Sequence, residues 1–283
     1  MRFLRVGPAG SERPAVLDTH GVAYDLTPLS ADIDGTFLAG GGVERARAAL
    51  AKGALPRTDL TGQRTGAPLA RPGKVVCVGL NYVDHAEETA TTPPAEPVVF
   101  MKAANTVVGP DDTVLIPRTS IKTDYEIELA VIIGRTARYL DSPDAADEVI
   151  AGYAIADDVS ERSFQHERGG QWDKGKSCET FNPLGPWLVT PDETGDPQDL
   201  ALRLRVNGEP RQDGHTKNMI FGVHHLVWYL SQFMVLDPGD VINTGTPAGV
   251  AFGANDFAYL RAGDVVEVEI DRLGRQRHTV GQA

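Results

Sequence analysis

The sequence predicts a β-rich α+β fold, a β-sandwich or rolled sheet preceded by a small N-terminal α/β cap, and three observations support this. After residue 73, strand-like segments far outnumber helical ones. The 283 residues include 30 glycines and 19 prolines, which indicates many turns between short strands. A polar, aperiodic segment at 56–72 separates this region from the N-terminus. We therefore expect a cap domain with its linker at 1–72 and a main domain at 73–283.

The expected elements follow in chain order. Short strands near 1–6, 15–18 and 22–26 and a helix near 43–52 form the cap. Beyond the junction comes a strand at 74–79, and then Asn81 as the N-cap of a short helix. Later strands are expected near 149–156, 187–190, 202–206, 241–244 and 265–270, and a long helix at 221–234. Turn sequences at 109–112 (GPDD) and 237–240 (DPGD) separate strands of this sheet.

The segment 125–133, YEIELAVII, is the clearest strand of the chain. Because side chains alternate between the two faces of a strand, Glu126 and Glu128 share one face with Ala130 and Ile132. The other face is entirely apolar. Two carboxylates are thus expected side by side on a buried strand.

Composition excludes several classes of function. A net charge of -12 without a Lys/Arg cluster argues against nucleic-acid and anionic-lipid partners. The two cysteines, Cys77 and Cys178, provide neither a disulfide framework nor a zinc set, so we expect free thiols. No run approaches ~18 consecutive apolar residues, and the first residues lack the apolar core of a secretory signal. We expect a cytoplasmic protein without a membrane span.

The strand glutamates are candidate metal ligands. Residues two apart in a strand lie about 6.5 Å apart and point the same way. Buried carboxylates must take up protons or find a cation, and an all-oxygen set favours Mg²⁺ or Mn²⁺ over zinc. The pair Asp157-Asp158, after the next apolar stretch, offers a third ligand. The alternative is a polar sheet face paired with basic residues, namely Arg135, Arg162 or Lys122.

Glu267 and Glu269 repeat the same spacing near the C-terminus. They lie among arginines, so we expect a solvated face there.

His85 and Glu88 are three residues apart, which places them on one face of a helix. A carboxylate there can orient an imidazole as a general base for water. A surface His/Glu pair is the alternative.

Residues 170–177, GQWDKGKS, formally match the phosphate-binding loop GxxxxGK[ST]. Such a loop needs a strand before it and a helix after it, and the polar and proline-containing flanks argue against both. Lys176 is then either a cation facing an acidic substrate or a solvated lysine. The turn at 244–249, TGTPAG, can offer N–H groups and hydroxyls to a carboxylate. We interpret His224 and His225 as packing or surface residues.

Several segments together resemble the fumarylacetoacetate hydrolase family. They are GLNYVDHAEE at 79–88, DYEIELAVIIG at 124–134, GYAIADDVSER at 152–162, GKSCETFNPLGPWLV at 175–189, VNGEPRQDG at 206–214 and TGTPAGV at 244–250. The resemblance implies a mixed β-sandwich roll of the family's C-terminal type, usually a homodimer. It also implies Mg²⁺ or Mn²⁺ held by Glu126, Glu128 and Asp158. Asp158 is preferred over Asp157 because it begins the family's DVSxR pattern.

The resemblance further implies site roles. The catalytic residues are expected to be His85, Glu88 and Lys176. Substrate binding is expected from Arg162, Gln165, Lys176 and Thr246.

The expected activity is metal-dependent hydrolysis of a carbon–carbon bond in a 2,4-diketo acid, either an acylpyruvate or a diketo-deoxy sugar acid, which releases pyruvate. The alternatives are decarboxylation of oxaloacetate and isomerisation of 2-hydroxyhepta-2,4-diene-1,7-dioate, which would use the same metal-enolate site. The His85/Glu88 pair favours hydrolysis. We expect the Thr- and Pro-rich segment 87–96 to close over the site.

Overall fold

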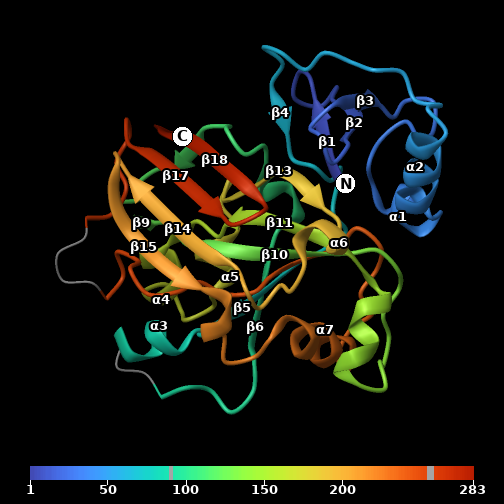
Figure 1. Ribbon diagram of the computed structural model, residues 1–283. Coiled ribbons are helices and arrows are strands. Elements are labelled where there is room, and N and C mark those ends of the chain that lie inside the picture. The colour runs from blue at the N-terminus through green and yellow to red at the C-terminus, as the bar shows by residue number, and fades with distance from the viewer. Residues whose placement is uncertain (89–91, 254–257) are drawn as a thin grey trace.

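The fold consists mainly of two β-sheets packed face to face (Figure 1). The structure is a computed structural model that describes residues 1–88, 92–253 and 258–283. Within these ranges the larger sheet has the strand order β3 (Ala23–Asp25), β2 (Arg13–Leu17), β1 (Arg2–Val6), β13 (Asn182–Val189), β11 (Ile150–Asp157), β10 (Ile127–Ile133), β16 (Val241–Asn243), β5 (Val75–Gly79) and β6 (Val98–Lys102). Two short strands extend it, β4 (Thr65–Gly66) beside β1 and β7 (Val107–Val108) beside β13. The sheet is mixed, since β16 pairs with β5 in parallel and with β10 antiparallel.

The smaller sheet lies on one side of β10 and β11 in Figure 1. Its order is β15 (Glu209–His215), β14 (Ala201–Val206), β17 (Val265–Ile270), β18 (Gly274–Gln282) and β8 (Val114–Ile116), and a separate pair is formed by β9 (Thr123–Asp124) and β12 (Ser160–Glu161). The short helices are α1 (Gly35–Ala39), α2 (Gly42–Ala51), α3 (Val83–Glu88), α4 (Arg162–His166), α5 (Asp173–Lys176), α6 (Pro191–Thr194) and α7 (Val223–Ser231). The predicted β-rich sandwich is confirmed.

Strand β10 is buried on both faces, as its alternating sequence predicts. Leu129 and Val131 pack between the two sheets, in one apolar cluster with Leu204 of β14 and Val268 of β17. Ala130 faces the opposite way, into a second cluster. Carboxylates at the start of this strand are therefore removed from water by the surrounding core.

The N-terminal segment extends the main sheet. Strand β1 pairs antiparallel with β13, where Arg2 faces Val189. Phe3 and Phe37 belong to the same apolar cluster as Ile132 of β10. Helix α1 begins after Asp34, whose side chain accepts a hydrogen bond from the Phe37 N–H, the capping that this residue type favours. The domain boundary between residues 72 and 73 stays a prediction.

Most local predictions hold with small shifts. The strand expected at 187–190 is the end of the longer β13, and the helix expected at 221–234 is limited to α7. One residue prediction fails. Asn81 lies two residues before α3, and its amide bonds to the chain elsewhere, to Phe221 N and O and to Thr244 O. Its prediction as the helix cap is wrong, because this side chain ties the helix to two distant loops instead. Within the described residues no helix is long and apolar enough to cross a bilayer.

Leu204→Ala should lower the free energy of unfolding by about 2–5 kcal/mol, because Leu204 is fully buried between the sheets and its loss leaves a cavity. Urea unfolding followed by circular dichroism measures the change. Val235→Ala, at a 40% exposed position, is the matched control and should cost less than about 0.5 kcal/mol. Equal effects of the two substitutions would contradict the assigned core.

Candidate functional site

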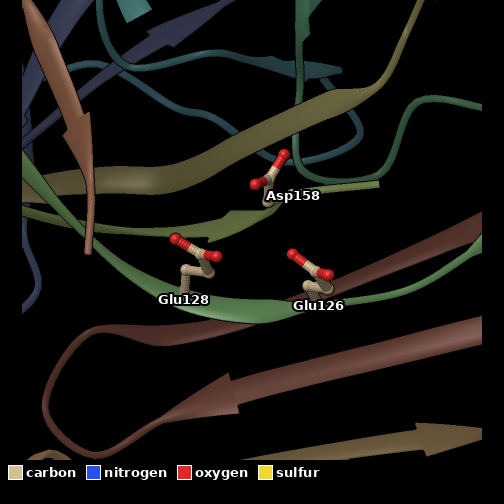
Figure 2. Close-up of side chains that lie close together, drawn as sticks. All are labelled: Glu126, Glu128 and Asp158. Carbon is tan, nitrogen blue, oxygen red and sulfur yellow. The ribbon is translucent and has the colours of Figure 1, made fainter. Parts of the chain in front are cut away.

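Three carboxylates meet where β10 begins and β11 ends (Figure 2). Antiparallel pairing places Ile127 opposite Asp157, and the Asp158 N–H donates to the Glu126 carbonyl over 2.9 Å. Glu126, Glu128 and Asp158 each offer an oxygen within 4.8 Å of the others, and all three are buried. Carboxylate oxygens at this separation suit a hard divalent cation. The cluster could therefore hold a metal ion.

Two cations neutralise Glu126. The Lys176 Nζ lies 2.6 Å from one oxygen of Glu126, and the Arg162 guanidinium lies 2.6 Å from the other. Burial alone would raise the pKa of Glu126, but Lys176 and Arg162 outweigh it and lower the pKa to about 2. Lys176 also contacts Asp158 over 2.8 Å. Lys176 is thus a buried cation within the cluster, not a solvated lysine.

Glu128 is the carboxylate that lacks such compensation. Its Oε2 accepts a hydrogen bond of 2.7 Å from the Gly245 N–H, and among the described residues no ion pair reaches it. Burial, followed by the charges of Asp158 and Glu126, raises its pKa well above the ordinary value. A divalent cation would remove this penalty, because it supplies the positive charge that the surrounding side chains do not give to Glu128. The donor set and its charge therefore fit Mg²⁺ or Mn²⁺.

Two buried residues of the site were missed by the sequence reasoning. Lys102 of β6 pairs with Asp158 and donates to the Val159 carbonyl. Asp124 of β9 binds Arg162 over 2.7 Å and accepts three backbone N–H groups, from residues 125, 251 and 252. Asp124 thereby sets the position of the arginine that holds Glu126. No spacing pattern marks either residue, because both reach the site through pairings between distant segments.

The structure separates the two candidate aspartates. Asp158 lies with the two glutamates. Asp157 instead accepts a hydrogen bond from the Glu126 N–H and lies 3.0 Å from His278 Nε2. Both side chains of this second pair are fully buried. Asp157 therefore supports the backbone of Glu126 and is not part of the three-carboxylate cluster.

His85 and Glu88 form a pair at the rim of the site. The His85 Nδ1 lies 3.5 Å from Glu88 Oε2, and the Glu88 carboxylate also accepts the Gly249 N–H. Burial would raise the pKa of Glu88, but His85 and this N–H lower it, so the group is a carboxylate near neutral pH. Only 8% of the surface of His85 is exposed, which argues against an ordinary surface pair.

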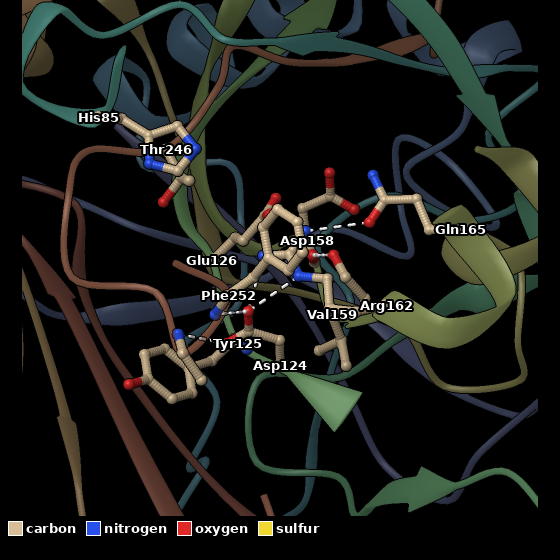
Figure 3. Close-up of polar contacts among 12 residues, drawn as sticks. His85, Asp124, Tyr125, Glu126, Asp158, Val159, Arg162, Gln165, Thr246 and Phe252 are labelled. Atoms are coloured by element: carbon tan, nitrogen blue, oxygen red, sulfur yellow. Dashed lines mark hydrogen bonds and ion pairs between the residues drawn. The ribbon is translucent and has the colours of Figure 1, made fainter. Parts of the chain in front are cut away.

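A cavity of about 190 Å³ connects these groups. The predicted substrate-binding residues Arg162, Gln165, Lys176 and Thr246 all line it, together with His85, Glu126 and Glu128. The Gln165 carbonyl oxygen accepts a bond from Arg162, which directs the amide nitrogen away from that arginine (Figure 3).

The hydroxyl of Thr246 is engaged within the protein. It donates to the Ile127 carbonyl and accepts a bond from the Gln212 amide. Binding of a substrate carboxylate by Thr246 therefore stays a prediction, as do the other residue roles.

The remaining sequence motifs do not add a second site among the described residues. The phosphate-loop pattern at 170–177 follows a helical segment, α4, and contains the four-residue helix α5, so it lacks the strand that a phosphate loop requires. Glu267 is partly exposed and lies 3.8 Å from Arg277, which agrees with the expected solvated face. His224 pairs with Asp147 over 2.9 Å at the protein surface.

Glu128→Gln should weaken Mn²⁺ binding at least about 100-fold, because it removes a charged ligand from a three-carboxylate set. Isothermal calorimetry on metal-free protein measures the affinity. Glu269→Gln, in the second strand with the same Glu-x-Glu spacing, is the matched control and should bind Mn²⁺ as the parent protein does. Unchanged affinity in Glu128→Gln would exclude the cluster as the metal site.

Similarity to known proteins indicates the family of this chain. The model of the fumarylacetoacetate (FAA) hydrolase C-terminal family matches residues 74–281. A 2,4-didehydro-3-deoxy-L-rhamnonate hydrolase from Sphingomonas sp. (strain SKA58) is 46% identical over 284 residues, which is 100% of this chain and 96% of that protein.

Two solved structures extend the comparison. A maleylpyruvate hydrolase from Sphingobium sp. SYK-6, in complex with manganese(II) and pyruvate, has a TM-score of 0.82 and 28% identity over 100% of both chains. A 2-hydroxyhepta-2,4-diene-1,7-dioate isomerase from Mycobacterium marinum has a TM-score of 0.76 and 32% identity over 100% of this chain and 98% of that one. The chain is therefore an enzyme of the fumarylacetoacetate hydrolase family.

Proposed function

We propose that this enzyme hydrolyses a carbon–carbon bond in a 2,4-diketo acid, an acylpyruvate or diketo-deoxy sugar acid, and releases pyruvate. The observation that carries the proposal is one small cavity lined both by carboxylates of the cluster and by His85, the partner of Glu88. The relatives named as hydrolases of a diketo-deoxy sugar acid and of maleylpyruvate support it.

The metal would be Mg²⁺ or Mn²⁺, held by Glu126, Glu128 and Asp158. When bound, it supplies a Lewis acid for the 1-carboxylate and 2-oxo group of the substrate. The manganese and pyruvate in the maleylpyruvate hydrolase structure support this assignment of the metal and the product.

His85 is assigned as the general base. Its Nδ1 faces Glu88, so Nε2 is the atom that takes a proton from water as the water oxygen bonds to C4 of the substrate. The C3–C4 bond then breaks, with its electron pair forming the enolate of pyruvate. The acyl group is released as a carboxylic acid, and the proton held on His85 Nε2 passes to C3 of the enolate, which gives pyruvate and restores the base.

Lys176 and Arg162 supply fixed positive charge beside the reacting atoms. Both are buried and ion-paired, so they do not reorganise while negative charge develops on the enolate oxygen. Burial would lower the pKa of Lys176, but Asp158 and Glu126 raise it, so the ammonium stays charged near neutral pH. Lys176 therefore acts as an electrostatic stabiliser in this proposal.

Decarboxylation of oxaloacetate and isomerisation of a hydroxydienedioate pass through the same enolate and are the alternatives. The isomerase relative makes the second relevant. The His85/Glu88 pair favours hydrolysis, because only that reaction needs an activated water.

Three expectations stay predictions. Homodimer formation and a cytoplasmic location are two of them. The third, closure of the segment 87–96, falls partly on residues 89–91, which lie outside the described residues; nearby, Glu96 accepts a hydrogen bond from the Tyr229 hydroxyl of α7.

An ultraviolet screen tests the reaction. Acylpyruvates, a diketo-deoxy sugar acid, oxaloacetate and the hydroxydienedioate are each incubated with enzyme plus Mg²⁺, Mn²⁺ or chelator. We expect metal-dependent loss of the diketo absorbance with stoichiometric pyruvate release. Turnover of oxaloacetate or the dienedioate alone would reject hydrolysis in favour of that alternative.

His85→Gln should lower kcat for hydrolysis by about 10²–10⁴-fold with little change in metal affinity, because it removes the base but no metal ligand. Stopped-flow absorbance and Mn²⁺ calorimetry measure the two effects. His224→Gln is the matched control, since His224 also lies on a short helix beside an acid, Asp147, but outside the cavity. Full hydrolysis by His85→Gln would exclude His85 as the base.

A further inference from the structure

Four rings form a continuous wall of the cavity, here called the aromatic wall: Phe100, Trp172, His166 and Phe252. His166 stacks on Phe252 with ring centroids 4.8 Å apart and meets Trp172 edge-on at 5.9 Å. Trp172 in turn lies 5.3 Å from Phe100. The rings come from four separate segments, so the wall is a product of the fold.

The wall is held in place by its neighbours. A Cβ on Gly79 of β5 would lie 2.6 Å from the Trp172 ring, so this glycine lets the indole pack directly on the strand. The next residue, Asp173, accepts the Met101 N–H of β6 over 3.1 Å. Trp172 is thereby fixed against two strands of the main sheet, and the width of the cavity is set on that side.

The cavity offers little positive charge to a second acidic group. Among the described residues, four of those lining it can carry such charge: His85, Arg162, His166 and Lys176. Arg162 and Lys176 are bound to buried carboxylates, and His85 pairs with Glu88.

His166 adds no charge to the wall near neutral pH. Burial lowers its pKa, and the charges of Arg162 and Lys176 lower it further. Two segments lie outside the described residues, Thr-Ala-Thr at 89–91 and Ala-Asn-Asp-Phe at 254–257. Their sequences contain no lysine, arginine or histidine.

We infer that the aromatic wall binds the substituent on C4 of the substrate and selects an uncharged one over one that ends in a carboxylate. This inference rests on the proposed function and deepens it.

Phe100 is buried at the inner part of the wall, whereas His166 and Phe252 are exposed at its outer part. Arg162 and Lys176 lie over the Phe252 and Phe100 rings, but both already bind buried carboxylates. A carboxylate against the inner rings would therefore lose water without gaining an unpaired cation, whereas carbon-bound hydrogens of a neutral chain pack on ring faces. One relative is named for a sugar acid with an uncharged substituent and another for a dioate. Membership of the family therefore does not decide which substituent this enzyme prefers.

A pair of substrates that differ in one group tests the selectivity. Butanoylpyruvate and succinylpyruvate have the same chain length and differ only by a terminal methyl or carboxylate. We expect kcat/KM with Mn²⁺ to favour butanoylpyruvate by roughly 100-fold or more, as expected for a carboxylate buried without a partner. Equal rates, or a preference for succinylpyruvate, would overturn the inference while leaving the reaction itself in place.

Two variants locate the selectivity. Phe252→Lys places a cation in the wall and should reduce the preference at least tenfold. Phe233→Lys, at an exposed phenylalanine outside the cavity, is the matched control and should keep it. Because each variant is compared with itself on two substrates, partial loss of folded protein does not alter the ratio. An unchanged ratio in Phe252→Lys would remove the wall as its cause.

A binding experiment tests this inference independently of the proposed reaction. Calorimetry with Mn²⁺ compares 2-oxoheptanoate with 2-oxoheptanedioate, which lack the C4 carbonyl and cannot be cleaved. At least tenfold tighter binding of the monoacid would support the inference, whether or not the diketo acids are hydrolysed. Absence of hydrolysis would reject only the proposed function. Equal binding of the two acids would overturn the inference.

Discussion

Three carboxylates buried within 4.8 Å of one another repel strongly, and the arrangement of the site follows from the need to offset that repulsion. Lys176 and Arg162 neutralise Glu126, and Lys102 with Lys176 neutralises Asp158. Glu128 receives one backbone N–H and no ion pair among the described residues. The cluster is therefore balanced except at the position where a divalent ion would bind all three groups.

The fold makes this concentration of charge possible. Both faces of β10 are covered, one by the smaller sheet and the other by the cluster that includes N-terminal residues such as Phe3. A strand that is buried in this way cannot shift its register without moving apolar side chains into polar surroundings. The register in turn places Asp158 beside Glu126, since Ile127 lies opposite Asp157. Apolar packing thus sets the separation of the carboxylates.

The sequence predicted the position of site residues well where these residues alternate along a single strand. The alternation in 125–133 predicted that Glu126 and Glu128 share a buried face, and the structure agrees. Periodicity left Asp157 and Asp158 equivalent, because adjacent residues at a strand end differ only in direction. The resemblance favoured Asp158, and the observed partner of Asp157, His278, lies 121 positions along the chain.

Pairings between residues far apart in the sequence were not predicted, because local periodicity does not identify a distant partner. Asp124 reaches Arg162 from 38 residues away and Lys102 reaches Asp158 from 56. The prediction of Asn81 as a helix cap failed because a residue type suited to capping formed tertiary hydrogen bonds instead, which local patterns cannot reveal. Predictions from local sequence are thus reliable for groups on one element and weak for groups that pair across the sheets.

The cavity has a charged part and an aromatic part, which differ in how strongly their residues depend on one another. The charged part is costly to build, since every ion needs a buried counter-ion, and any change there alters several pairs at once. The rings of the aromatic wall need no counter-ion, although charged groups contact the wall at two places, the Arg162 guanidinium over the Phe252 ring at 5.2 Å and the Lys176 ammonium over the Phe100 ring at 5.0 Å. Substitutions in the wall can therefore change which substituent fits while the carboxylate cluster keeps its geometry.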